Sequence, residues 1–147
     1  MKRFEFTLEK MLSFKDQMLS GEKLRLADLR SRLSKLILTL EQLQAEYGRC
    51  DIELKTQEQI GLTPQEIFQR KAYLNVLNDK VKLQKQYIKA MEAKISEQVA
   101  VVVQASQDVT TLEKLKERQL EEYRFAEGKE QELLIDEFVS NSTTAAS

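Results

Sequence analysis

The chain has 147 residues, the length of one ordinary domain, with one proline, four glycines and no tryptophan, which favours long helices over a loop-rich fold. It contains no histidine and a single cysteine, so it lacks the commonest general base and zinc ligand and cannot form an internal disulfide. With 23 basic against 24 acidic residues the net charge is −1, which gives the whole chain no electrostatic attraction to nucleic acid or anionic lipid.

The N-terminal sequence does not have the pattern of a targeting segment. Glu5 stands between Phe4 and Phe6 and interrupts the apolar start, whereas a signal peptide needs an uninterrupted apolar core. No later stretch reaches the roughly 18 apolar residues of a membrane-spanning helix. The cysteine content suits a reducing compartment, and we therefore expect a soluble cytoplasmic protein.

The first predicted element is a helix over about residues 4–59. Its apolar residues alternate between spacings of three and four, which is typical of a helix in a left-handed coiled coil. The stripe comprises Leu8, Leu12, Lys15, Leu19, Glu22, Leu26, Leu29, Leu33, Leu36, Leu40, Leu43, Tyr47, Cys50 and Leu54. Among them only Lys15 and Glu22 are charged. The core is therefore expected to be a seam between helices.

A turn is predicted at residues 60–63, where the first stripe ends. Gly61 can end a helix, and Thr63 suits the N-cap of the next one. Pro64 then takes the first helical position and Glu66 the third, which completes a capping box. A second helix should begin at this point.

The second helix is predicted to be the longer one, over about residues 64–138. Its stripe comprises Ile67, Arg70, Leu74, Leu77, Val81, Gln84, Ile88, Met91, Ile95, Gln98, Val102, Ala105, Val109 and Leu112. After Leu112 this helix outruns its partner, so its charged continuation is expected to project as an overhang. Residues 139–147, rich in Ser, Thr and Ala, are expected to be a disordered tail.

Folding the chain back at the turn brings the two stripes into one antiparallel seam. The predicted partners are Leu54 with Ile67, Tyr47 with Leu74, Leu40 with Val81, Leu33 with Ile88, Leu26 with Ile95, Leu19 with Val102 and Leu12 with Val109. The same register places Glu22 and Gln98 in one layer, and a polar layer commonly fixes register at a cost in stability. Two chains pairing in parallel as single long helices are a less favoured alternative, because Thr63–Pro64 starts a helix better than it continues one. The predicted fold is thus all-α, an antiparallel coiled-coil hairpin with a longer C-terminal helix, and residues 1–138 form its single domain.

No residues in the sequence point to catalysis or to a cofactor. The phosphate-binding, dinucleotide-binding and zinc-protease motifs are absent from it, and a Ser/His/Asp set needs histidine. Acidic pairs such as Glu121–Glu122 on a solvated helix are far more often ordinary surface than a general acid and base. Cys50 occupies a seam position and is interpreted as a small core residue. We therefore expect a protein that is not an enzyme and binds no cofactor or metal.

A basic stretch over residues 70–94 is the one feature that suggests nucleic acid or an acidic protein as a partner. Its basic residues are Arg70, Lys71, Lys80, Lys82, Lys85, Lys89 and Lys94. Acidic residues of the first helix lie opposite in the predicted register, and aromatic residues are not interleaved as a base-stacking surface requires. A solvated helix face without nucleic acid is the favoured interpretation.

Several apolar residues fall outside the seam. They are Phe4, Phe6, Met11, Phe14, Met18, Tyr73, Tyr87, Leu120, Tyr123 and Phe125. Widening of the seam accounts for some of them, and the others suggest a surface that a partner covers.

Short motifs at both ends and at the turn occur in a characteristic order. They are Phe4–x–Phe6–x–Leu8 with Leu12, then Gly61 with Thr63–Pro64–Gln65–Glu66, then Tyr73–Leu74–x–x–Leu77, and finally Leu112–Glu113–Lys114–Leu115–Lys116–Glu117 with Glu122–Tyr123 and Asp136–Glu137. In this order and spacing they resemble the FliJ family of flagellar export proteins, over nearly the whole chain.

The resemblance implies a non-enzymatic component of the flagellar type III export apparatus, similar to the central stalk of rotary ATPases. The implied partners are the hexameric flagellar export ATPase and the export gate membrane protein, with export chaperones as a further class, and the implied location is the cytoplasmic face of the membrane, through these partners. A coiled-coil adaptor with unrelated partners, or a stalk of a virulence secretion system, remains an alternative.

The resemblance also implies two groups of contact residues. Those expected to bind the ATPase are Phe4, Phe6, Leu115, Arg118, Glu122 and Tyr123, with Phe4 and Phe6 exposed beside the overhang. Those expected to bind the export gate are Leu40, Leu43, Tyr47, Tyr73 and Leu77, several of which are also seam residues.

Overall fold

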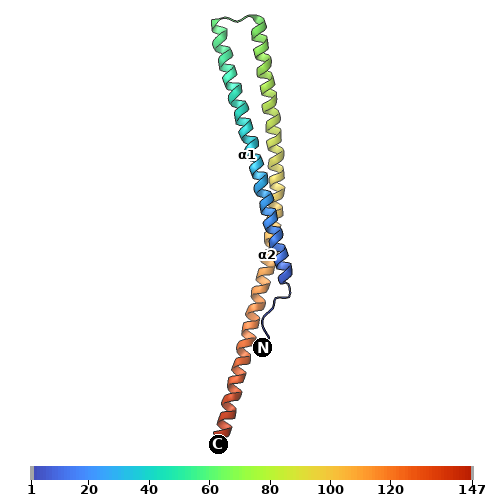
Figure 1. Ribbon diagram of the computed structural model, residues 1–147, viewed down its shortest axis with the longest axis vertical. Helices are drawn as coiled ribbons and strands as arrows, with labels where there is room; N and C mark the ends of the chain where they lie inside the picture. Colours follow the sequence, from blue (N-terminus) through green and yellow to red (C-terminus); the bar gives the residue numbers. More distant parts are fainter. Residues whose placement is uncertain (1, 147) are drawn as a thin grey trace. The chain divides into compact units, whose positions relative to one another are not determined.

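The computed structural model describes residues 2–146, and within them it contains two α-helices, α1 (Glu9–Ile60) and α2 (Pro64–Ala146) (Figure 1). The helices run antiparallel and α2 is the longer, which confirms the predicted all-α hairpin. The chain divides into two compact units. Glu22–Val101 forms the turn unit, and Met1–Gly21 with Val102–Ser147 forms the terminal unit.

In the turn unit, residues 61–63 connect the two helices (Figure 1). Gly61 has a φ of 120°, in a region that side chains with a Cβ rarely enter. The Thr63 hydroxyl accepts a hydrogen bond from Glu66 N (3.2 Å), and the Glu66 carboxylate accepts one from Thr63 N (3.3 Å). The predicted turn and capping box are therefore confirmed.

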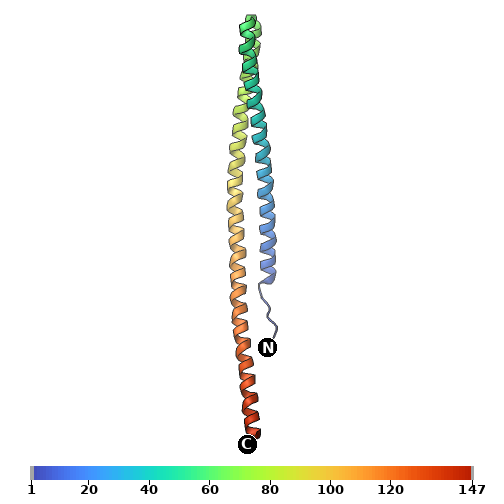
Figure 2. The same ribbon diagram turned by 90° about the vertical axis from the view of Figure 1, so that its left-hand side faces the viewer.

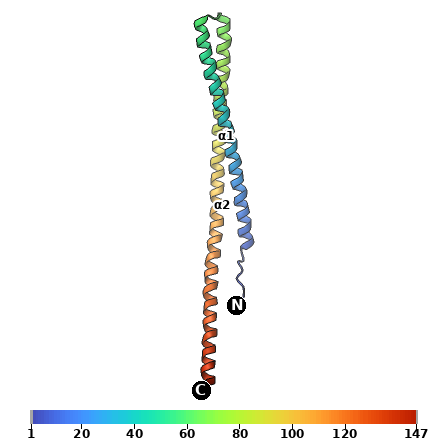
Figure 3. The ribbon, with the colours of Figure 1, turned by 60° about the vertical axis from the view of Figure 1, so that its left-hand side comes forward.

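The core of the turn unit is the predicted seam. Leu26, Leu54, Leu74 and Leu77 are buried in it, and the three ribbon views agree that the two helices lie side by side (Figures 1, 2 and 3). Alternating spacings of three and four place such residues on one helix face, where burial of each large apolar side chain contributes about 1.5–3 kcal/mol. Of the predicted α1 stripe only Tyr47, with 36% of its surface accessible, is exposed.

Hydrogen bonds from two buried glutamines to the opposite helix fix the register of the turn unit. Gln98 is buried, and its side-chain amide donates to the backbone carbonyl of Glu22 (3.0 Å) and to the Glu22 carboxylate. Gln84, also buried, donates to the carbonyl of Leu36 (2.9 Å). The predicted layer of Glu22 with Gln98 is confirmed, and Gln84 adds a second polar layer.

In the terminal unit, the first turns of α1 pack against α2 (Figure 2). Leu19 and Val109 are buried in their seam. Lys15, one of the two charged members of the α1 stripe, reaches out of the seam, and its Nζ lies 3.7 Å from Asp108 Oδ2. The long Lys15 stem can cover apolar surface while its charge stays in water.

The outer ends of the helices differ from the predicted ones. The first helix was expected from about residue 4 but begins at Glu9, because Phe6 is buried and its carbonyl accepts a hydrogen bond from Glu9 N (3.1 Å) in the turn that precedes the helix. The second helix was expected to end at about residue 138 but reaches Ala146, where the hydroxyls of Thr143 and Thr144 donate to carbonyls of the preceding turn (both 2.8 Å). The expected disordered tail, 139–147, is thus helical as far as it is described. The single domain predicted over residues 1–138 stays a prediction.

Candidate partner-binding surfaces

The N-terminal segment, residues 2–8, lies against α2 and is held there by aromatic side chains. The ring of Phe4 contacts the ring of Tyr123, with centroids 5.5 Å apart and planes tilted by 53°. Tilted aromatic pairs at this separation contribute beyond their buried area. The Tyr123 hydroxyl also donates a hydrogen bond to the Lys2 carbonyl. We call Phe4, Phe6 and Tyr123 the aromatic lock.

The lock corrects the expectation that Phe4 and Phe6 are exposed. Phe6 retains only 7% of its accessible surface, and Phe4 is half-buried. The physical reason is the continuation of the α2 stripe beyond the start of α1, where the non-helical segment covers it. The sequence signal for this arrangement was the pair of phenylalanines directly before the first helix.

An ion pair lies beside the lock and ties the start of α1 to α2. Lys116 Nζ lies 2.8 Å from Glu9 Oε2. Both side chains are partly exposed, so the pair contributes on the order of 1 kcal/mol or less. The same lysine lines a shallow groove together with Phe4, Glu5, Phe6, Thr7, Glu9 and Lys10. Sequence reasoning did not predict either contact.

The pKa of Tyr123 is raised above its ordinary value. Partial burial against the N-terminal segment is the main cause, and the carboxylates of Glu127 and Glu130 add to it. All of these effects disfavour the phenolate. Tyr123 therefore stays a neutral hydrogen-bond donor at neutral pH, as its bond to Lys2 requires.

The other residues predicted to bind the ATPase lie along the same stretch of α2. Leu115 is half-buried, whereas Arg118 and Glu122 are exposed. These two residues are one helical turn apart and form an ion pair, with Arg118 Nε 3.8 Å from Glu122 Oε1. The structure thus brings Phe4 and Tyr123 into contact, buries Phe6, and leaves Arg118 and Glu122 on the surface. Of the six predicted residues, the exposed pair presents the most accessible surface to a partner, and Phe6 is buried.

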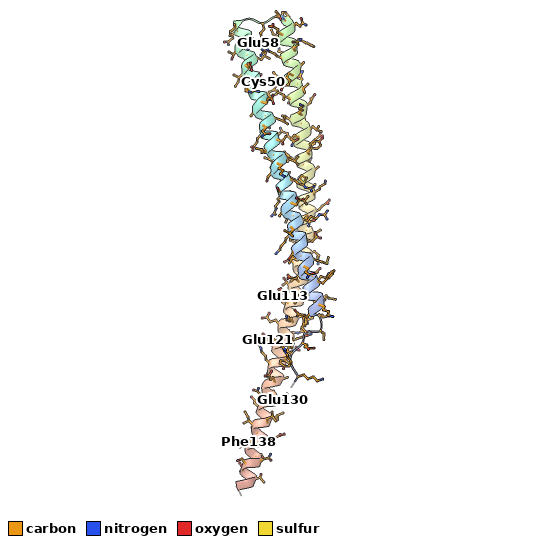
Figure 4. All side chains as sticks on the ribbon, in the orientation of Figure 1. Cys50, Glu58, Glu113, Glu121, Glu130 and Phe138 are labelled. Carbon is orange, nitrogen blue, oxygen red and sulfur yellow. The ribbon has the colours of Figure 1, made fainter. Side chains whose placement is uncertain are left out.

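Beyond the lock, α2 continues as a segment with exposed apolar side chains, which we call the C-terminal extension (residues 128–144). Its described residues are all exposed, and Figure 4 labels Glu130 and Phe138 on it. The large apolar ones are Leu133 (63%), Leu134 (59%), Ile135 (62%), Phe138 (74%) and Val139 (55%). Sequence reasoning did not single out this cluster, although four of its five residues lie within the predicted second helix and Leu134 and Phe138 share a helix face.

In the turn unit, Tyr73 lies on the surface between the two helices. Its hydroxyl donates a hydrogen bond to Glu46 Oε1 (2.6 Å), and this bond, with desolvation and the negative charge of Glu46, raises the pKa of Tyr73. Cys50, Glu53, Gln69 and Arg70 line a shallow groove with Tyr73. Cys50 is half-buried and free, as its predicted seam position requires.

The residues predicted to bind the export gate divide by burial. Leu77 retains 2% of its accessible surface, and Leu40 and Leu43 are half-buried in the seam. Tyr47 (36%) and Tyr73 (45%) are exposed. Leu77 therefore stabilises the hairpin in this structure, and the two tyrosines are the members of the group that present a surface.

Residues 2–146 contain no cluster of three or more side chains suited to a metal ion. None of the helical stretches described is both long and apolar enough to cross a membrane.

Comparison with known proteins identifies the family. The family described as Flagellar FliJ protein matches residues 4–145. No curated protein and no solved structure matches the chain. Since the family match covers nearly the whole chain, this chain belongs to the FliJ family and is a component of the flagellar export apparatus.

Proposed function

We propose that the chain acts as a non-enzymatic central stalk in flagellar protein export. In this proposal the terminal unit binds the hexameric export ATPase and promotes its assembly, and the turn unit contacts the export gate. Membrane association is then peripheral, at the cytoplasmic face, and passes through these partners. Family membership supports the export role, and the surfaces support the division of labour.

The C-terminal extension is the observation that carries the ATPase-binding part of the proposal. Its exposed leucines, isoleucine and phenylalanine form an apolar patch of the kind that marks a protein interaction site. Acidic residues are interspersed among them at Glu132, Asp136 and Glu137. A surface that mixes charge with apolar side chains can contact several subunits of a ring without binding one of them permanently.

The aromatic lock gives this extension a defined base. The rings of Phe4 and Tyr123 are in contact, and Lys116 pairs with Glu9, so the chain start is fixed beside the helix that leads into the extension. Arg118 and Glu122 remain exposed on the same helix. We propose that the lock orients the helix and that the exposed pair and the extension make the contacts.

The test is ATP hydrolysis by the flagellar export ATPase of the source organism at increasing amounts of this chain, with ring assembly followed in parallel. The full chain is expected to stimulate both. The double variant Leu134→Glu/Phe138→Glu should lose the stimulation, because it places charge where the ring would cover apolar surface. Leu83→Glu, at an exposed site of the turn unit (46%), is the matched control. Equal stimulation by all three proteins would refute the proposal.

For the export gate, we propose a contact through Tyr47 and Tyr73. Tyrosine is enriched at interfaces because its ring buries apolar area while its hydroxyl keeps a polar partner. Binding of the soluble domain of the gate protein should weaken in Tyr73→Ala and stay unchanged in Tyr87→Ala, which removes an equally exposed tyrosine (51%) from the same helix. An equal effect of both substitutions would contradict this assignment.

Export chaperones are a further class of partner that we propose from family membership alone. Titration of the chain with a flagellar export chaperone, followed by calorimetry, tests it directly. Absence of heat with every chaperone of the source organism would exclude the escort role.

A further inference from the structure

The face of α1 directed away from the seam of the turn unit carries a second heptad-spaced stripe. This outer stripe consists of Leu24, Ser31, Leu38, Ala45 and Ile52. Its large members are strongly exposed, at 72% for Leu24, 55% for Leu38 and 67% for Ile52. Residues at heptad spacing stay on one face of a coiled-coil helix, so the three apolar side chains form a single line that nothing in residues 2–146 buries.

The order of large and small residues in the outer stripe is symmetric about Leu38. We propose that two copies of this chain associate through it, as an antiparallel pair of α1 helices centred on Leu38. Leu24 then lies opposite Ile52 of the second copy, Ser31 lies opposite Ala45, and Leu38 meets its own counterpart. A two-fold interface requires such self-complementarity of one patch.

Small residues beside the stripe allow the two helices to approach closely. Ala27, Ser34, Glu41 and Gly48 alternate with the outer stripe at spacings of three and four, and all of them except Glu41 are small. The space beside Gly48 is open. In the proposed register Ala27 of one copy lies opposite Gly48 of the other. Small side chains reduce the distance between packed helices, although they also bury less apolar area than the leucines of the internal seam.

Charges that flank the stripe are complementary in this register and argue for a second copy as the occupant. Lys23 would face Asp51 of the second copy, and Asp28 would face Arg49 of the second copy. Lys23 and Asp51 each lie one residue before Leu24 and Ile52, which face each other in the adjacent central layer. Inside the hairpin, the hydrogen-bonded residues Glu46 and Tyr73 likewise each lie one residue before the predicted seam partners Tyr47 and Leu74. Ile37, exposed at 39%, would meet its own counterpart at the centre of that side. Opposite charges at flanking positions are the usual determinant of partner choice in coiled coils.

In the single chain the two aspartates already form ion pairs within α1. Asp28 Oδ2 lies 3.0 Å from Arg32 Nε, and Asp51 Oδ2 lies 3.0 Å from Lys55 Nζ. Surface ion pairs of this kind are weak. Replacing them by ion pairs with the second copy, or sharing each aspartate between the two, therefore costs little free energy. The apolar line therefore drives the association and the charges select the register, which predicts a weak, concentration-dependent dimer.

Analytical ultracentrifugation of the full chain tests the association. The mass should rise from 17.1 kDa towards twice that value as concentration increases. Leu38→Glu should remain monomeric with an unchanged helical circular dichroism spectrum, whereas Leu83→Glu, an exposed leucine on α2, should dimerise like the original chain. A monomer at every concentration, or a dimer that survives Leu38→Glu, would overturn the proposal.

Disulfide trapping in a Cys50→Ser background tests the antiparallel register. Chains carrying Leu38→Cys should cross-link to one another. A Leu24→Cys chain should cross-link to an Ile52→Cys chain and not to itself. Self-cross-linking of Leu24→Cys would indicate a parallel pair, and cross-linking of Leu38→Cys only to other proteins would show a different occupant, so either result rejects the proposed dimer.

Discussion

Two buried glutamines show how single residues specify the pairing of a long, repetitive seam. A row of leucines can slip by a whole heptad and still bury apolar area. Gln98 and Gln84 instead donate hydrogen bonds to the backbone of the opposite helix at Glu22 and Leu36. A slipped register would leave these buried amides without acceptors, at about 1–3 kcal/mol each.

Replacing the layer of Glu22 and Gln98 by two leucines is expected to stabilise the hairpin. Buried polar layers exchanged for well-packed apolar residues commonly gain about 1–4 kcal/mol. The melting temperature, measured by circular dichroism, should therefore rise in Glu22→Leu/Gln98→Leu. A lower melting temperature would show that this layer adds stability as well as specificity.

The hydrogen bond between Tyr73 and Glu46 predicts a pH dependence of the hairpin. The bond raises the folded-state pKa of Tyr73 above its unfolded value near 10. The stability that it contributes is complete below about pH 10 and is lost as the pH rises through the folded-state pKa. In Glu46→Gln the negative charge is gone, so phenolate absorbance is expected to appear at lower pH than in the original chain.

Two further variants make the titration specific. Tyr73→Phe identifies which part of the absorbance change belongs to this residue. Glu41→Gln removes an exposed carboxylate from the same helix and is expected to leave the curve unchanged. If Glu46→Gln and the original chain give superimposable curves, the bond does not persist in solution.

At the scale of the elements, the turn depends on a backbone conformation that only one of the glycines adopts. Gly61 has a positive φ, whereas Gly128 lies within α2 with open space around it. Gly61→Ala should lower the free energy of unfolding by about 1–3 kcal/mol through backbone strain. Gly128→Ala should leave that value unchanged or raise local helix stability by up to about 1 kcal/mol. Chemical denaturation measures both, and a loss in Gly128→Ala as large as that in Gly61→Ala would exclude the strain argument.

The inner ends of the helices could be predicted from sequence, whereas the outer ends could not. At the turn, Gly61, Thr63, Pro64 and Glu66 each act on their immediate neighbours, so local rules suffice. At the chain start, a non-helical segment precedes the helix, where Phe6 is buried and Phe4 contacts Tyr123, a residue distant in sequence. At the far end, propensity alone does not separate a helical continuation from a tail.

For the whole molecule, burial separates the predicted site residues that lie in the seam from those that present a surface. Seam spacing located Leu40, Leu43 and Leu77, but the same spacing means that they are core residues rather than free contacts. Tyr73 lies beside the seam and stays exposed. The lock between Phe4 and Tyr123 needed the spatial position of a non-helical segment, which periodicity does not provide.

The two compact units are expected to open independently. Phe6→Ala removes a buried aromatic side chain from the terminal unit and should destabilise that unit by about 3–5 kcal/mol. Amide hydrogen exchange should accelerate around Leu112–Tyr123 and stay unchanged around Leu74. Phe68→Ala, at a site that is 74% exposed, is the control, and uniform acceleration in Phe6→Ala would contradict independent opening.

The capped turn also favours one order of assembly of the hairpin. Contacts beside it, such as Arg70 with Glu53 and Tyr73 with Glu46, close short loops and have a small entropic cost. Phe4 and Tyr123 lie at opposite ends of the paired sequence and meet only after the intervening layers have formed. We therefore expect folding to nucleate at the turn and to proceed towards the termini, because contacts between residues close in sequence have the smallest entropic cost. During synthesis the first helix emerges before the second, so its seam leucines remain exposed to solvent until the second half of the chain has been made.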